Sequence, residues 1–240
     1  MPRVSIVTAM PTEIWPLIRG WEQREFEHAG RRYEFYEHGD EVALCGGIGY
    51  EAGQRAAEAT IAYARPDLII AAGLAGGLKP EWTLGKTLTP AIIIEEATGQ
   101  RYATLRGAGT VVSSRVIAGV ELKRELAARF SADIVDMEGA AIASVAAKHG
   151  IPLLAAKAVS DALDFPLPPL QPFVDQDGRF QAARFTLHAA VRPAWWPLIW
   201  KLKRHSAAAA EALAELLTTM IRDTHAGPRS SYNSVSAQSS

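Results

Sequence analysis

Apolar and polar positions along the chain fall in blocks that predict an α/β domain. Three continuous apolar runs, at 4–9, 67–72 and 152–159, have the pattern of strands that are buried on both faces. Between them, the stretch at 51–64 places small residues on one side of a helix, and 120–130 is predicted as a second helix. Strands that alternate with helices in this way are typical of a sheet covered by helices.

The stretch at 133–161 predicts a strand, a helix and a second strand. An Ala-rich helix is expected at 139–148, and Pro152 prevents its continuation because proline lacks the required N–H. We expect the two strands to be parallel. Glu138 and Asp161 then stand where the first and the second strand end. Ligands bind beyond the carboxyl ends of parallel strands, so we expect both carboxylates to face one crevice. Either acid alone is also common as a helix cap.

Further candidates follow other strand ends. Glu13 comes just after the first strand, at the start of a predicted helix. Two glycine-rich segments, at 46–49 and 73–77, are predicted as turns that let the backbone approach a ligand. The sequence GGIGYEAG at 46–53 misses the G-x-G-x-x-G pattern, so a dinucleotide site is only weakly indicated. We find no serine or cysteine nucleophile with its base, no P-loop and no histidine-rich metal set.

The remaining elements complete one domain at 1–224 and a tail. A hairpin is expected to turn at Gly39, and Pro90 is expected to bend a strand at 87–95 or to place it at an edge. The small polar residues of 225–240 predict a disordered tail. Three helical segments are expected in the last third of the chain, at 180–191, 193–204 and 206–222.

Composition narrows the function classes. At 240 residues with 48% hydrophobic content, the chain is long enough for one large domain with a full core. A net charge of −1 gives no general attraction to nucleic acid. The single cysteine, Cys45, excludes an internal disulfide and a cysteine-ligated zinc site. The short apolar start is interpreted as a strand rather than a signal peptide, and no run reaches a membrane span. We expect a cytoplasmic protein without metal or cofactor.

The acids at the strand ends suit the cleavage of a glycosidic bond. One acid protonates the leaving group, a second carboxylate holds sugar hydroxyls, and a third activates the nucleophile. If the leaving group is a purine, the proton goes to a ring nitrogen. An ordinary Asp has a pKa of about 3.9, so a neutral carboxyl near pH 7 requires a pKa raised by about 3, or about 4 kcal/mol. We expect apolar burial beside Val159 and Leu163 to act in that direction on Asp161.

Four segments carry a resemblance to a known family. The sequences VSIVTAMPTE, CGGIGYEAG, PDLIIAAGLAGGLKPEWTLGKTL and IVDMEGAAIASVAAKHGIPLLAAKAVSD, in this order over about 4–163, resemble the purine nucleoside phosphorylase and nucleosidase family. They are nearest to its methylthioadenosine/S-adenosylhomocysteine nucleosidase-like branch. The resemblance implies a single domain with a twisted mixed β-sheet flanked by helices, and assembly as a homo-oligomer.

The same resemblance assigns roles to residues. Asp161, preceded by Ser160, is implied as the acid that protonates purine N7. Glu138 is implied to hold the ribose hydroxyls, with Met137 packed against the sugar. Glu13 is implied to orient or deprotonate the attacking water in the nucleosidase branch.

The chain departs from the family pattern in two places. The sequence AGLAGG supplies Gly73 and Gly76 as expected substrate-binding residues, but Leu74 stands where the family commonly has a small hydroxyl residue. The segment at 87–113 is short for the family, so part of the wall around the base is missing or comes from a partner subunit.

The C-terminal segment at 175–213, DQDGRFQAARFTLHAAVRPAWWPLIWKLKRHSAAAAEAL, resembles the tail of the hopanoid-associated phosphorylase branch. That branch is thought to remove adenine from an adenosine whose 5′ carbon bears a large polycyclic hydrocarbon. In 193–204, three tryptophans, among them Trp196 and Trp200, lie next to lysine and arginine. This pattern suits a lipid interface or an apolar substrate mouth, and we expect weak membrane association through it. Alternatively, these tryptophans pack on the sheet or on a second subunit.

Three readings of the function stay open at this point. The first is cleavage of a 5′-substituted adenine nucleoside, with either phosphate or water as the acceptor. Arg19 and Arg115 are candidate phosphate ligands, whereas a carboxylate at Glu13 repels phosphate and favours water. The second is an ordinary methylthioadenosine/S-adenosylhomocysteine hydrolase, and the third is a non-catalytic nucleoside-binding module.

Overall fold

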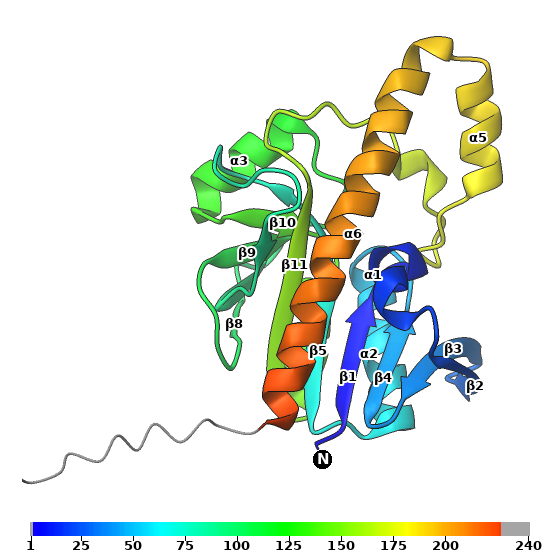
Figure 1. Cartoon of the computed structure of the whole chain (residues 1–240). Helices are drawn as coiled ribbons and strands as arrows, with labels where there is room; N and C mark the ends of the chain where they lie inside the picture. The colour runs from blue at the N-terminus through cyan, green and yellow to red at the C-terminus, as the bar shows by residue number, and fades with distance from the viewer. Residues whose placement is uncertain (1, 227–240) are drawn as a thin grey trace, which may run out of the picture.

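A computed structural model describes residues 2–226 of the chain, and within them one mixed sheet of eleven strands forms the centre of the fold (Figure 1). The strands are β1 (Val4–Thr8), β2 (Glu22–His28), β3 (Arg31–His38), β4 (Glu41–Cys45), β5 (Leu68–Gly77), β6 (Thr87–Leu88), β7 (Ile92–Glu95), β8 (Arg101–Ala103), β9 (Thr110–Ser113), β10 (Ile134–Asp136) and β11 (Leu153–Asp161). The prediction of a single α/β domain with a mixed sheet is confirmed.

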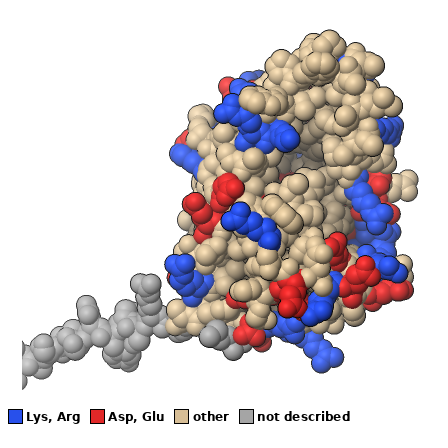
Figure 2. Space-filling model, turned by 45° about the vertical axis from the view of Figure 1, so that its right-hand side comes forward, with Lys and Arg blue, Asp and Glu red and all other residues tan. Residues whose placement is uncertain are grey.

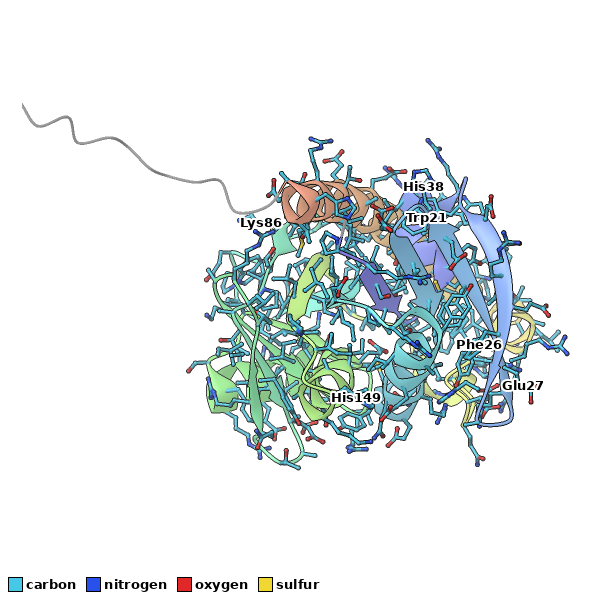
Figure 3. All side chains as sticks on the ribbon, turned by 90° about the horizontal axis from the view of Figure 1, so that it is seen from below. Trp21, Phe26, Glu27, His38, Lys86 and His149 are labelled. Atoms are coloured by element: carbon cyan, nitrogen blue, oxygen red, sulfur yellow. The ribbon has the colours of Figure 1, made fainter. Side chains whose placement is uncertain are left out.

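Helices cover both faces of this sheet, as the view from below shows (Figure 3). The helices are α1 (Pro11–Ile18), α2 (Tyr50–Ala64), α3 (Val120–Phe130), α4 (Gly139–Lys148), α5 (Ala182–Ala190) and α6 (Trp196–His225). Helices α2 and α4 pack on one face through apolar residues such as Ala56 and Ile142. Helices α1 and α6 pack on the other face, through Ile14 and Leu213. These two apolar layers hold the sheet in place.

Strand β5 is the central element. Its residues from Leu68 to Ala71 pair in parallel with β1, and those from Ile69 to Gly76 pair in parallel with β11. Its last two residues, Gly76 and Gly77, pair antiparallel with β10. The end of β5 is therefore enclosed by strands on both edges, and the residues that follow β1, β10 and β11 meet around it.

The prediction of two parallel strands around α4 is wrong. Strands β10 and β11 pair with opposite orientation to β5 and not with each other. The prediction of a turn at 73–77 is also wrong, because these glycines continue β5. Their lack of side chains serves packing instead: a Cβ at Gly77 would lie 2.4 Å from the carbonyl oxygen of Trp82. Crowding from neighbouring elements is not visible in the local sequence.

The C-terminal helices differ from the prediction as well. The segments predicted at 193–204 and 206–222 form the single helix α6, after a short 3₁₀ turn at Pro193–Trp195. Pro197 lies in the first turn of α6, where no backbone N–H is needed. Helix α6 includes His225, and the predicted tail beyond residue 226 lies outside the described residues. Within the described part of the chain, no helix has the length and hydropathy to cross a membrane.

Two further predictions about the strands agree with the structure, and one strand was not predicted. The hairpin at Gly39 forms between β3 and β4, and the predicted strand at 87–95 is interrupted around Pro90, between β6 and β7. Strand β2 was missed, because its sequence EQREFEH is mostly polar. It is an exposed edge strand in which Phe26 packs on Tyr63 while the neighbouring Glu27 faces solvent (Figure 3).

Candidate active site

A pocket of about 370 Å³ lies where the ends of β1, β5, β10 and β11 meet. Figure 2 shows a hollow in the surface between the body of the molecule and the tip that carries α5. Predicted site residues line this pocket together: Glu13, Leu74, Gly76, Met137, Glu138, Ser160 and Asp161. The expectation that Glu138 and Asp161 face one crevice therefore holds, although their strands are not parallel neighbours.

Asp161 and Ser160 reach the pocket through an irregularity in β11. Consecutive side chains of a regular strand point to opposite faces. The register of β11 against β5 shifts between Val159 and Asp161, and such bulges re-aim side chains next to functional sites. Both side chains therefore line the pocket. The Ser160 hydroxyl donates a hydrogen bond to Oδ1 of Asp161 at 2.7 Å.

The second oxygen of Asp161 contacts Lys123, a residue of α3 that the sequence analysis did not single out. The Lys123 ammonium donates to Oδ2 of Asp161 and to the carbonyl oxygen of Ala162, the latter at 2.7 Å. The side chains of Lys123 and Asp161 are 1% and 8% exposed. Asp161 is thus buried as expected, but it is paired with a cation rather than set in purely apolar surroundings.

Glu13 combines a helix-start role with a place in the pocket. Its Oε2 accepts hydrogen bonds from the Thr8 hydroxyl and from the backbone N–H groups of Ala9 and Met10. These contacts hold the first turn of α1 against the end of β1. Among the described residues no group donates to Oε1. One oxygen of this buried carboxylate is therefore free to accept a hydrogen bond from a bound molecule.

Glu138 lies just before α4 and is buried against the glycine-rich segment that begins α2. Its Oε1 accepts a hydrogen bond from the Gly49 backbone N–H at 2.6 Å. Burial, with the nearby carboxylates of Asp136 and Glu13, raises the pKa of Glu138 to about 8. A Cβ at Gly53 would lie 3.1 Å from the Cβ of Glu138, so α2 approaches this side chain closely.

A buried ion pair between Lys157 and Asp136 lies near Glu13 and Glu138. Lys157 in β11 lies 2.6 Å from Oδ2 of Asp136, and neither side chain is exposed. Asp136 also accepts hydrogen bonds from the Ser113 hydroxyl at 2.5 Å and from the Gly139 N–H at 3.0 Å. Burial alone would lower the pKa of Lys157, but the carboxylates of Asp136, Glu138 and Glu13 raise it above its ordinary value. The lysine therefore stays charged and offsets the repulsion between these acids.

Gly73 lies in the wall behind the pocket rather than on its surface. A Cβ there would meet the Lys157 ammonium at 3.5 Å, and Glu13 Oε2 and Thr8 Oγ1 at 3.6 Å. Its φ of +147° also disfavours any other residue. In this structure Gly73 packs against Lys157 and Glu13, and its contact with a substrate stays a prediction.

Apolar side chains form the remainder of the pocket wall. They come from the segments after β1, β4 and β9, the loop after β11, and helices α5 and α6. The lining includes Met10, Ile48, Val116, Ile117, Leu167, Leu170, Val174, Phe180, Phe185, Ile199 and Leu202. Phe180 and Phe185 are the aromatic rings of this lining, and no motif in the sequence indicates them.

The tryptophans of 193–204 do not take part in this wall. Trp196 and Trp200 are 55% and 64% exposed, on the outer side of α6. These two residues therefore do not pack on the sheet, whereas their packing on a second subunit stays a prediction. The inner side of α6 presents Ile199, Leu202 and Lys203 to the pocket.

The two arginines considered as phosphate ligands lie elsewhere. Arg115 donates to Glu51 at 2.6 Å and to Glu95 at 3.3 Å, and it does not line the pocket. Arg19 is exposed at the end of α1. Within residues 2–226 the cationic side chains that line the pocket are Lys123 and Lys203.

Some of the residues that the analysis missed do have a sequence signal. Asp136 and Lys157 are charges inside otherwise apolar strands, where an ionised side chain requires a partner. Lys123 has no such signal, because a lysine on the amphipathic helix α3 normally faces solvent.

The arrangement suits acid–base chemistry on a small, partly apolar molecule. Three buried acids, Glu13, Glu138 and Asp161, surround one pocket. One oxygen of Glu13 and one of Glu138 are held by the protein, whereas both oxygens of Asp161 are held, by Ser160 and Lys123. In the described part of the chain, no cluster of three or more His, Cys, Asp or Glu side chains is placed to hold a metal ion.

Comparison with known proteins identifies the fold and the family. The fold is similar to that of the futalosine hydrolase of Helicobacter pylori strain 26695, at 17% identity and a TM-score of 0.67, covering 91% of this chain and 97% of that chain. It is also similar to the 5′-methylthioadenosine/S-adenosylhomocysteine nucleosidase of Colwellia psychrerythraea 34H, solved with adenine, at 17% identity and a TM-score of 0.71, covering 92% and 95%. The corresponding enzyme of Neisseria meningitidis, solved with methylthio-immucillin-A, gives 20% identity and a TM-score of 0.69, covering 92% and 99%.

A sequence search of curated proteins finds no match. A family model does match the chain, in two overlapping segments at 3–105 and 91–194. These segments include every acid of the pocket. The chain belongs to the phosphorylase superfamily.

Proposed function

We propose that the protein cleaves the N-glycosidic bond of a purine nucleoside. The observation that carries this proposal is the convergence of Glu13, Glu138 and Asp161 on one pocket. The three carboxylates match the three tasks of the reaction, which are protonation of the base, binding of the sugar and activation of the nucleophile. The structural neighbours that hold adenine or a methylthio-nucleoside analogue support this choice of substrate class.

In this mechanism Asp161 protonates N7 of the purine. The electron pair of the breaking C1′–N9 bond moves into the ring, and the added proton makes the base a neutral leaving group. Glu138 accepts hydrogen bonds from the ribose hydroxyls through its free oxygen, while Met137 packs against the sugar. The free Oε1 of Glu13 accepts a proton from the water that attacks C1′. One proton enters the base and one leaves the water, so the products are the free purine and ribose.

Water is the acceptor that the charges around Glu13 favour. A carboxylate beside the nucleophile repels phosphate, and both arginines that could bind phosphate lie outside the pocket. Phosphate is the second candidate, because Lys203 brings one cation to the pocket wall. Incubation with adenosine and inosine, with and without phosphate, followed by measurement of free base, tests the function and separates the acceptors. A non-catalytic binding module would bind the nucleoside and release no base in either buffer.

The pocket wall indicates an apolar group on the 5′ carbon of the nucleoside. Beyond the acids, the wall consists of aliphatic and aromatic side chains such as Leu170, Phe180 and Leu202. Burial of apolar surface contributes about 25 cal/mol per Å², so a long hydrocarbon gains several kcal/mol there. We propose an adenosine with a large apolar 5′ substituent, of the adenosylhopane type, as the substrate.

A series of 5′-substituted adenosines tests this substrate class. We expect kcat/KM to rise from methylthioadenosine to analogues with longer alkylthio chains. Leu202→Ser should reduce the gain from the long chains, whereas Leu187→Ser, on the exposed side of α5, should leave it unchanged. A preference for methylthioadenosine over every bulkier analogue would instead identify an ordinary methylthioadenosine/S-adenosylhomocysteine hydrolase.

The outer surface of the same tip suits a lipid surface. Trp196, Trp200, Leu187 and Val191 are each more than half exposed, and Figure 2 shows the tip as largely uncharged with cations at its margin. Exposed aromatic and aliphatic side chains next to cations are typical of interfacial segments. We therefore propose weak association with membranes through 193–204, which would bring the pocket close to a lipid-dissolved substrate.

Flotation with vesicles tests this association. We expect the protein to float with vesicles that contain anionic lipid, and less so at high salt, because cations contribute to the binding. The double variant Trp196→Ala, Trp200→Ala should lose flotation while it still cleaves methylthioadenosine, because neither side chain lines the pocket. Exposed Trp15 lies on α1, away from this tip, so Trp15→Ala is the matched control. No flotation of the unmodified protein would contradict the proposal.

A further inference from the structure

The contact between Lys123 and Asp161 is the feature of the pocket that the proposed mechanism leaves unused. The Lys123 side chain is 1% exposed. Burial of its charge carries a large desolvation penalty unless the ammonium is paired and hydrogen-bonded. Its ammonium contacts Oδ2 of Asp161, the carbonyl oxygen of Asp161 at 3.4 Å and that of Ala162 at 2.7 Å. The three donors of the ammonium thus have three acceptors. Lys123 is fixed in place and has no donor left for a substrate.

Gly76 shows that the fold makes room for this pair. A Cβ at Gly76 would lie 2.8 Å from Cε and 3.2 Å from Nζ of Lys123, and 3.1 Å from Oδ2 of Asp161. Any other residue there would push the ammonium away from the carboxylate. Gly76 is in β5, Lys123 in α3 and Asp161 in β11, so three separate elements meet at the contact between Lys123 and Asp161.

We propose that Lys123 and Asp161 form a two-residue acid, in which Lys123 is the positioning residue that holds the proton and Asp161 delivers it to the base. This assignment rests on the proposed function. An aspartate ion-paired to an ammonium is ionised and has no proton of its own to give. As the C1′–N9 bond breaks, one N–H bond of Lys123 breaks and an O–H bond forms on Asp161. That O–H bond then breaks as an N–H bond forms at purine N7, which leaves Asp161 ionised and Lys123 as a neutral amine. The neutral amine regains a proton from solvent after the base has left.

The pair predicts how the pH profile depends on Lys123. An ammonium holds its proton to about pH 10 and a carboxyl only to about pH 4 in water. Removal of the ammonium removes the proposed source of the proton, so a variant at Lys123 should differ from the unmodified protein in how kcat falls with rising pH. The other charged side chains on the pocket wall, within the described residues, are Glu13, Asp136, Glu138 and Lys203. They are the same in every Lys123 variant, so a comparison between variants isolates the pair.

Measurement of kcat against pH at saturating nucleoside, for the unmodified protein and for two variants, tests the proposal. Lys123→Met should move the alkaline limb of kcat to lower pH and reduce kcat at pH 8 by about 10²-fold. Lys123→Arg keeps the charge, but a guanidinium does not release its proton. We therefore expect it to bind nucleoside with little change in KM and to turn over slowly at every pH. Lys79→Met removes an ion pair with Asp133, outside the pocket, and should leave the profile unchanged.

Several outcomes would overturn the assignment. An unshifted profile in Lys123→Met would show that Asp161 obtains its proton elsewhere, and full activity in Lys123→Arg would reduce Lys123 to a fixed charge. If neither variant folds, the temperature dependence of the alkaline limb in the unmodified protein decides. An ammonium has a large enthalpy of ionisation, so the limb should move to lower pH on warming, and a limb that does not move would contradict the proposal. Base release with an unaltered profile overturns this assignment alone, whereas no base release at all overturns the proposed function with it.

Discussion

Asp161→Asn should release base from a purine nucleoside about 10²–10⁴ times more slowly than the unmodified protein, with nucleoside binding retained. The amide cannot accept a proton from Lys123 and deliver it to N7. Its oxygen can still accept the hydrogen bond from Ser160, so the pocket should keep its shape. Single-turnover measurement of free purine, together with the binding of a non-cleavable nucleoside analogue, separates the loss of chemistry from the loss of binding.

The matched control for this variant is Asp164→Asn. Asp164 is exposed, lies three residues further along the chain and does not line the pocket. Its variant should keep full turnover. If Asp161→Asn also kept near-full turnover, Asp161 would not be the proton donor, and the roles of both Asp161 and Lys123 would have to be abandoned.

If water is the acceptor, Glu13→Gln should release base about 10²–10⁴ times more slowly than the unmodified protein in phosphate-free buffer. A carboxylate can take a proton from the attacking water and an amide cannot. If phosphate is the acceptor, the same variant should keep most of its phosphate-dependent release, because the charge that repels phosphate is gone. Free base measured in the two buffers therefore identifies the acceptor.

The helix-start role of Glu13 requires its own control. Glu121 is an exposed acid in the first turn of α3 and does not line the pocket. Glu121→Gln removes a comparable interaction with the helix dipole, so it should change the melting temperature slightly and leave base release intact. Activity of Glu13→Gln that is unchanged in both buffers would leave Glu13 with only its contacts to Thr8 and the backbone of α1.

The elements with local signals could be predicted from the order of residues alone. Continuous apolar runs gave the buried strands β1 and β11, and helical spacing gave α3 and α4, because hydrophobic periodicity follows secondary structure directly. The acids Glu13, Glu138 and Asp161 stood out because each follows the end of an apolar strand. These positions met in one pocket, since the ends of neighbouring strands lie close together in a sheet.

Features that depend on contacts between distant segments could not be predicted in this way. The direction of β10 against β5, and the continuation of β5 through Gly76, depend on which strands come to lie on its two edges. The pairing of Lys123 with Asp161 joins a helix to a strand 38 residues away. A lysine on an amphipathic helix looks the same in the sequence whether it faces water or a buried carboxylate. The partner, and therefore the chemistry, is set by packing.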